Sequence, residues 1–232
     1  MNTFEIDANG EEIILSEDKE IVMMEWEKPY MEQSIDFLKP CGDVLEIGFG
    51  CGYSATQILK YPIKSYTIIE CDDDTIERIK IWRKSYDVPI IIVKGKWEQN
   101  LHTLGIFDKI YFDDYPLDIN ENSTLNEKIL SQRRLVLFMD MVIKNHTRVG
   151  SQISFYLTGN HEIKFSGETE FFIKKQYLNI NTKIPYLCDY RNVKEQKCLI
   201  PLITKVKKYD YVAVKKFMYE EIQKHQRGYL LW

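Results

Sequence analysis

Hydrophobic and polar positions follow two different periods along the middle of the chain. Short apolar runs bounded by turn residues are typical of buried β-strands, and they occur at residues 43–48, 65–70, 88–94, 107–113 and 151–156. The segments between these runs have helical composition, and the longest covers residues 127–144. Strands and helices that alternate in this way predict an α/β domain with a parallel sheet and helices on both faces.

The N-terminal pattern is weaker. Asn9 and Gly10 give a turn signal within the first 15 residues, so we expect a short ordered arm that acts as a flap over residues 1–15. Ser16 precedes two acidic residues, as a helix N-cap does, and the apolar spacing that follows predicts a helix over residues 16–38. Pro29 is expected to kink or break that helix, because proline removes an amide donor and clashes with the preceding turn.

The C-terminal part gives three further expectations. Residues 168–177 have the composition of a helix, and residues 181–190 and 197–206 resemble a closing antiparallel pair of strands. Residues 211–226 form an amphipathic helix in which Val214, Phe217, Met218 and Ile222 share one stripe. That stripe would pack on the domain or on a second subunit, which leaves a homodimer open.

Composition and charge then narrow the partners. A chain of 232 residues with 44% hydrophobic residues can bury one substantial core. The formal charge of −4 provides no broad basic surface for nucleic acid or an anionic membrane, so a small ligand or a defined protein partner is expected. The acidic start lacks a signal-peptide core and no run approaches about 18 apolar residues, which predicts a cytoplasmic chain. Five cysteines without CxxC spacing and four scattered histidines predict neither a disulfide framework nor a metal site.

A glycine-rich turn carries the main chemical signal. In VLEIGFGCGYSA, Gly48, Gly50 and Gly52 follow the first strand and precede a helix, where doubly wound sheets bind their cofactors. Tight strand-to-helix turns also use glycine for geometry alone, so the motif by itself leaves a structural role open. Glu70 ends the second strand about 20 positions later, where an acid can accept both hydroxyls of a ribose.

The ExGxGxG form of this turn, with Glu46 in the strand, differs from the GxGxxG of dinucleotide-binding proteins. It resembles class I S-adenosylmethionine-dependent methyltransferases. The resemblance implies a Rossmann-like, mostly parallel seven-stranded sheet closed by an antiparallel pair. It also implies that Trp97 flanks the adenine and Glu98 lies beside its exocyclic amine. A core or helix-start aromatic is the less favoured alternative for Trp97. The cofactor-binding residues implied are Met23, Met31, Glu46, Gly48, Phe49, Gly50, Cys51, Gly52, Tyr53, Glu70, Cys71, Asp72, Lys96, Trp97, Glu98 and Asp113.

Three stretches narrow the resemblance to one family. VMMEWEKPYM (22–31), PIKSYTIIEC (62–71) and FDKIYFDDYPL (107–117) are similar to guanidinoacetate N-methyltransferase and its relatives, which include arginine δ-N-methyltransferases. The family implies that Glu27 and Asp113 grip the substrate guanidinium.

The same resemblance implies the rest of the substrate site. Trp26 and Tyr30 would line the cleft, and the backbone amides of Leu157 and Thr158 would hold a substrate carboxylate. Asp114 departs from the family, which has a small hydroxyl residue there, and its added charge would favour a more cationic substrate or a different tail.

The chemistry of a guanidinium explains the paired acids. Full deprotonation of a group with a pKa near 13 would cost about 8 kcal/mol at pH 7, and nearby carboxylates raise that pKa further. The acids therefore act by orienting the nitrogen and accepting its proton as the carbon–nitrogen bond forms. We expect Asp113 to be the base and Glu27 to orient the substrate. Apart from the family, Glu27 would be interpreted as a surface acid and Asp113 as a loop residue.

These observations predict a single methyltransferase domain. Its parts are the flap over 1–15, a substrate-side helix over 16–38, a catalytic core over 40–206 and a C-terminal helical extension over 208–232. The predicted enzyme transfers a methyl group from S-adenosylmethionine to a small guanidino compound, with guanidinoacetate as the leading candidate. The alternatives are methylation of arginine, free or within a protein, or of another small amine; a cofactor-binding protein that acts through a partner; and a dehydrogenase.

Overall fold

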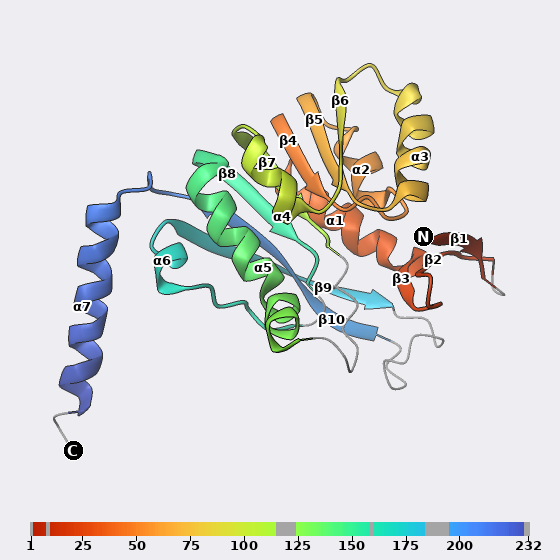
Figure 1. Ribbon diagram of the computed structural model, residues 1–232. Coiled ribbons are helices and arrows are strands. Elements are labelled where there is room, and N and C mark those ends of the chain that lie inside the picture. The colour runs from red at the N-terminus through yellow and green to blue at the C-terminus, as the bar shows by residue number, and fades with distance from the viewer. Residues whose placement is uncertain (1, 8–9, 115–123, 158–159, 184–194, 230–232) are drawn as a thin grey trace.

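A seven-stranded sheet forms the centre of the protein (Figure 1). The computed structural model describes residues 2–7, 10–114, 124–157, 160–183 and 195–229. In spatial order the strands are β6 (Ile90–Lys94), β5 (Ile63–Glu70), β4 (Gly42–Ile47), β7 (Phe107–Phe112), β8 (Thr147–Phe155), β10 (Glu195–Lys205) and β9 (Ile173–Lys183). The first five run parallel, and β10 is antiparallel to both of its neighbours. This topology confirms the predicted fold class.

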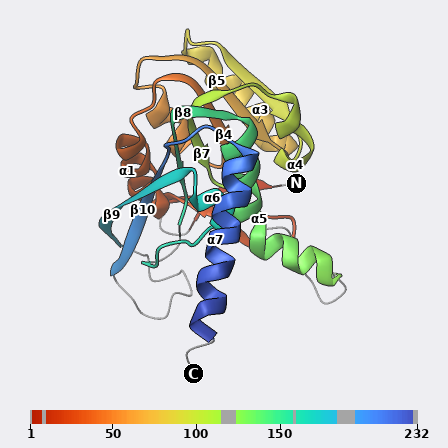
Figure 2. The ribbon, with the colours of Figure 1, turned by 90° about the vertical axis from the view of Figure 1, so that its left-hand side faces the viewer.

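Helices cover both faces of the sheet because its strands alternate their apolar side chains between two cores. On one face Val44, Tyr66 and Ile68 pack with residues of α1 (Lys28–Leu38), α2 (Tyr53–Ile58) and α3 (Asp73–Trp82). On the other face Leu45 and Ile69 pack with α4 (Trp97–Asn100) and α5 (Leu125–Asn145). Figure 2 shows α1 and α5 on opposite sides of the sheet. The 3₁₀ turns η2 (Arg83–Ser85) and η3 (Leu101–Thr103) follow α3 and α4.

The N-terminal prediction was only partly right. The expected arm exists as β1 (Thr3–Ile6) and β2 (Glu12–Leu15), but β3 (Ile21–Met24) joins them in a separate antiparallel sheet. The helix predicted over 16–38 is therefore wrong in its first half. Residues 21–24 pair with β2, the turn η1 (Glu25–Glu27) follows, and α1 begins only at Lys28. Pro29 lies in the first turn of α1, where its missing amide donor costs nothing.

The C-terminal predictions had mixed outcomes. The helix expected over 168–177 is wrong, because only α6 (Gly167–Glu170) is helical and β9 then pairs along its whole length with β10. The predicted antiparallel pair is present, although residues 184–190 of its first strand lie outside the described residues. The amphipathic helix is α7 (Tyr211–Tyr229), which extends away from the sheet (Figure 1). Val214 is buried and Phe217 packs on Phe171 with ring centroids 4.9 Å apart.

Within the described ranges, no helix is both long enough and apolar enough to cross a bilayer.

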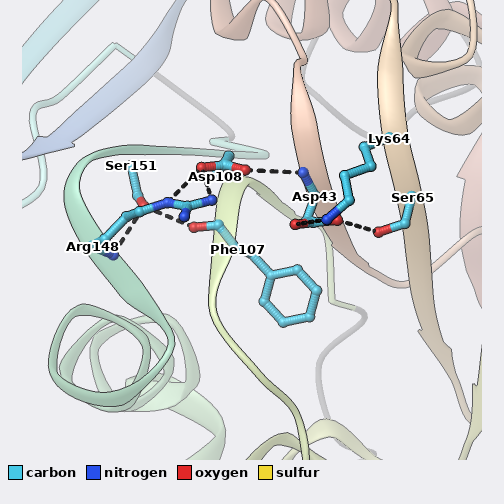
Figure 3. A network of polar contacts seen from close by, with 7 residues as sticks. All are labelled: Asp43, Lys64, Ser65, Phe107, Asp108, Arg148 and Ser151. Carbon is cyan, nitrogen blue, oxygen red and sulfur yellow. Dashed lines mark hydrogen bonds and ion pairs between the residues drawn. The ribbon is translucent and has the colours of Figure 1, made fainter.

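A polar network fastens the amino-terminal ends of the parallel strands (Figure 3). The Asp108 carboxylate accepts the backbone amide of Asp43 at 3.0 Å and the Arg148 Nε at 2.7 Å. Asp43 in turn accepts the Ser65 hydroxyl at 2.7 Å. The network thereby links β4, β5, β7 and β8 at the edge opposite their carboxyl ends.

We expect Asp108→Ala to lower the free energy of unfolding by about 1–2 kcal/mol, because a partly buried amide and a guanidinium lose their acceptor. For a chain of this length that corresponds to a fall in melting temperature of about 3–6 °C in differential scanning calorimetry. Asp87→Ala, which removes an exposed acid, is the control. Equal melting temperatures for the two variants would contradict this role of Asp108.

Candidate active site

The glycine turn lies at the carboxyl end of β4, and its backbone conformation favours glycine at three positions. Gly48, Gly50 and Gly52 have φ values of +79°, +53° and +79°. A Cβ on Gly48 would lie 2.0 Å from the backbone carbonyl oxygen of Asp113, and a Cβ on Gly50 would lie 2.5 Å from the Met23 thioether. The turn is thus packed between the end of β7 and strand β3. Met23 also accepts the Cys51 amide on its sulfur at 3.1 Å.

Glu70 connects the end of β5 to the same turn. Its carboxylate accepts three backbone amides, from Cys71 at 2.7 Å, Asp72 at 2.9 Å and Phe49 at 3.0 Å. Burial raises the pKa of Glu70, and the three amides oppose that rise because they stabilise the charged form. Asp72 caps α3 by accepting the Thr75 amide at 2.9 Å. The carboxyl group of Glu70 is therefore held in one orientation beside the turn.

Glu46 lies in the core of the domain, whereas Glu70 lies beside the glycine turn. Its side chain is fully buried within the sheet face that packs on α1 to α3, and it accepts the hydroxyl of Tyr66. Burial raises the pKa of Glu46 to about 8, so this carboxyl group is mostly neutral at pH 7. Its predicted contact with the cofactor stays a prediction, since the group lies beneath the turn.

Glu27 and Asp113 come together at the carboxyl edge of the sheet. Glu27 is 8% exposed, and its carboxylate accepts the Met24 amide at 2.9 Å. Asp113 directly follows β7 and donates its own amide to the Ile47 carbonyl at 3.0 Å. Burial raises the pKa of Asp113 well above its ordinary value, and the charge of Glu27 is the next largest cause. The pKa of Glu27 is also raised by burial, against the amide of Met24 and the hydroxyl of Tyr156.

Of the remaining predicted substrate-side residues, Tyr30 and Leu157 are bonded to each other. Tyr30 is buried, donates its hydroxyl to the Leu199 carbonyl at 2.9 Å and accepts the Leu157 amide at 3.0 Å. The Leu157 amide predicted to hold a carboxylate is thus bonded to Tyr30, and Thr158 lies outside the described residues. The indole nitrogen of Trp26 is buried and has no hydrogen-bond partner among the described residues.

Met31 and Tyr53, both predicted to bind cofactor, lie in one buried cluster with Met23. The Tyr53 hydroxyl donates to Glu12 of β2 at 2.6 Å, so the N-terminal sheet is bonded to the helix that follows the glycine turn.

On the predicted adenine side, Trp97 lies in the core, and Arg134, which the sequence interpretation missed, pairs with its neighbours. Trp97 is 2% exposed and its ring packs edge-on against Phe138 at 5.4 Å, so it has the core position that the sequence left open. Its indole nitrogen donates to Asp114 at 3.0 Å. Arg134 of α5 forms ion pairs with both Asp114 and Glu98. Lys96 is exposed at the start of α4.

This arrangement changes the role expected for Asp114. Its negative charge is paired with Arg134, so it is not free to attract a more cationic substrate as the sequence suggested. The available sequence signal for Arg134 is its spacing, because it lies four positions before Phe138 and so shares the buried face of α5.

The fold is that of class I methyltransferases. The N-methyltransferase NodS from Bradyrhizobium japonicum WM9 matches this structure with a TM-score of 0.54 and 14% identity, over 78% of this chain and 97% of that one. The precorrin-6Y C5,15-methyltransferase from Geobacter metallireducens GS-15 matches with a TM-score of 0.52 and 12% identity, over 87% and 98%. These likenesses concern the fold alone.

The family model of guanidinoacetate N-methyltransferase matches residues 7–151, and the chain belongs to that family. Protein arginine N-methyltransferase 2 from Candida glabrata is 35% identical over 116 residues, which are 44% of this chain and 27% of that protein. The protein of the same name from Saccharomyces cerevisiae is 31% identical over 125 residues, 48% of this chain and 30% of that protein. The matched region spans less than a third of these relatives.

Gly48→Ala tests the packing of the glycine turn. We expect it to weaken binding of S-adenosylhomocysteine and to lower the melting temperature more than Gly150→Ala does. Both positions have positive φ, but a Cβ on Gly150 meets nothing within 4 Å, whereas at Gly48 it meets backbone. The positive φ alone should lower the free energy of unfolding by roughly 1–2 kcal/mol in either alanine variant. Any larger loss of stability in Gly48→Ala therefore reports the contact with Asp113. Equal effects in calorimetry would refute this account of the turn.

Proposed function

We propose that this chain is an S-adenosylmethionine-dependent N-methyltransferase that methylates a guanidino nitrogen of a small cationic acceptor, with guanidinoacetate as the leading candidate. The observation that carries the proposal is the pair of carboxyl groups, Glu27 and Asp113, beside the glycine turn. Burial raises the pKa of both acids, and the charge of Glu27 raises that of Asp113 further, so a cation at this site would stabilise their ionised forms. Family membership supports the same class of reaction.

The residues around the glycine turn fit S-adenosylmethionine. The packing of Gly48 against the Asp113 backbone and of Gly50 against Met23 holds the turn at the carboxyl edge of β4, which is where doubly wound sheets bind their cofactors. Three amides fix Glu70 and occupy three of the about four lone-pair sites of its carboxylate, so the remaining site on Oε2 could accept one ribose hydroxyl. When bound, the cofactor supplies a methyl group on a positively charged sulfur, which is open to attack by a nitrogen lone pair.

The two acids would then position and deprotonate the acceptor. A guanidinium that enters between them favours their ionised forms and is held with one nitrogen directed at the methyl group. As the nitrogen–carbon bond forms and the sulfur–carbon bond breaks, the nitrogen loses a proton, which Asp113 accepts and later releases to water. The Met24 amide holds the Glu27 carboxylate in place, so Glu27 would keep the bound guanidinium in one orientation.

Arginine, free or within a protein, is the second candidate acceptor. The relatives named protein arginine N-methyltransferase 2 support it. So does the bond from the Leu157 amide to the Tyr30 hydroxyl, because a short substrate carboxylate at this amide would have to displace Tyr30. An arginine side chain keeps its carboxylate, or its peptide backbone, further from the guanidino group and avoids that competition.

The domain organisation supports one catalytic unit. We propose that residues 40–206 are the catalytic core, with the N-terminal sheet as a flap on the cofactor side. Phe4 of β1 packs on Arg78 with the guanidinium 4.1 Å from its ring centroid, and Arg78 donates to the Gly50 carbonyl at 3.3 Å. Strand β1 is thus linked to the glycine turn, and α7 would belong to the proposed helical extension.

Mass spectrometry of methylated products tests the proposal. The protein is incubated with S-adenosylmethionine and, separately, guanidinoacetate, arginine, an arginine peptide and simple diamines. We expect product from a guanidino compound and a loss of roughly 10²–10⁴-fold in kcat for Asp113→Asn, as for removal of a general base. Asp87→Asn is the matched control. Turnover of a diamine but of no guanidine would reject the substrate class, and an active Asp113→Asn would reject the base.

A further inference from the structure

Arg134 is buried beside the proposed cofactor site although no substrate chemistry requires it. It is 7% exposed on α5, and its guanidinium bonds to Asp114 through Nε and to Glu98 through a terminal nitrogen. The guanidinium also lies 5.5 Å from the Trp97 ring centroid. One side chain therefore contacts the three residues Trp97, Glu98 and Asp114, which come from two separate segments of the chain.

Arg134, Trp97, Glu98 and Asp114 form one connected network of polar contacts. Asp114 accepts both Arg134 and the Trp97 indole nitrogen on the same carboxylate oxygen. Glu98 is 37% exposed at its side chain, so its pairing with Arg134 leaves part of it available to a ligand. The two carboxylates raise the pKa of Arg134 against the effect of burial, so it stays charged. A planar guanidinium can bridge two carboxylates in this way, whereas an ammonium is a single point charge.

We propose that Arg134 is a positioning residue that holds Glu98 and Trp97 at the adenine end of the cofactor site and neutralises Asp114 beside Asp113. The inference rests on the proposed function, since it concerns the site of the same methyl donor. Arg134 would not touch either substrate. It fixes the partly exposed Glu98 and the buried Trp97 behind it, and it shields the proton acceptor from a neighbouring negative charge.

The second part of the role is electrostatic. Asp114 is among the charges that raise the pKa of Asp113. Among the described residues, the titratable and charged groups around Asp113 are Glu27 of η1, Glu46 of β4, Glu70 of β5, Tyr30 of α1, Tyr111 of β7, Asp114 and, paired with Asp114, Arg134 of α5. Without Arg134, an unpaired Asp114 would raise the pKa of Asp113 further.

Calorimetric titration with S-adenosylhomocysteine tests the positioning role without turnover. We expect Arg134→Gln to weaken binding about tenfold or more, because Glu98 and Trp97 lose a charged partner. Arg133→Gln, which removes the exposed neighbouring arginine of the same helix, should bind as the wild type does. Equal affinities for Arg134→Gln and Arg133→Gln would overturn the positioning role. A wild-type protein that binds no S-adenosylhomocysteine would instead reject the proposed function itself.

The pH profile of kcat/KM tests the electrostatic role. In Arg134→Gln the acidic limb should move to higher pH, and in the double variant Arg134→Gln/Asp114→Asn it should return while binding stays weak. A limb that does not move, or is not restored, would overturn the shielding of Asp113.

If Arg134→Gln does not fold, Asp114→Asn alone should move the limb to lower pH, and Arg134→Lys should weaken binding and leave the limb in place. The opposite results would overturn the proposal.

Discussion

Burial of several carboxyl groups at one edge of the sheet is the constraint on which the candidate active site depends. Glu27, Glu46, Glu70 and Asp113 all lie at or beneath the carboxyl edge of the central strands, and burial raises the pKa of each. Buried acids of like charge oppose one another's ionisation. A fold that brings these acids together must therefore keep them protonated, hydrogen-bond their carboxylates or pair them with cations.

The structure treats each acid differently, and the differences separate their roles. Glu46 is mostly neutral and bonded to Tyr66, whereas three backbone amides support the charge of Glu70. Asp114, next to the group, is paired with Arg134. Glu27 has one amide and a tyrosine hydroxyl, and no ion pair compensates Asp113 within the part of the chain that the structure describes. Those two acids are left for a cation from outside, which is why a guanidino substrate suits the site.

Local patterns sufficed to predict the centre of this fold. The five parallel strands have continuous apolar runs, and the glycine turn and Glu70 follow directly from where those strands end. Strand β3 was mistaken for helix because its conformation depends on pairing with β2, which its own apolar spacing does not reveal. Arg134 was missed for a similar reason. Its partners Asp114 and Glu98 are 20 and 36 positions away, so only the packing of α5 against α4 and the end of β7 brings them together.

Proton release on substrate binding tests the central claim most directly. If Asp113 holds a proton in the free site because burial and Glu27 raise its pKa, an entering guanidinium should expel that proton as it stabilises the carboxylate. Calorimetric titration of guanidinoacetate or an arginine peptide into the complex with S-adenosylhomocysteine, in buffers of different ionisation enthalpy, measures the release. We expect net release from the wild type at pH values below the raised pKa of Asp113, and its loss in Asp113→Asn. Binding without release, or equal release from both proteins, would contradict the account.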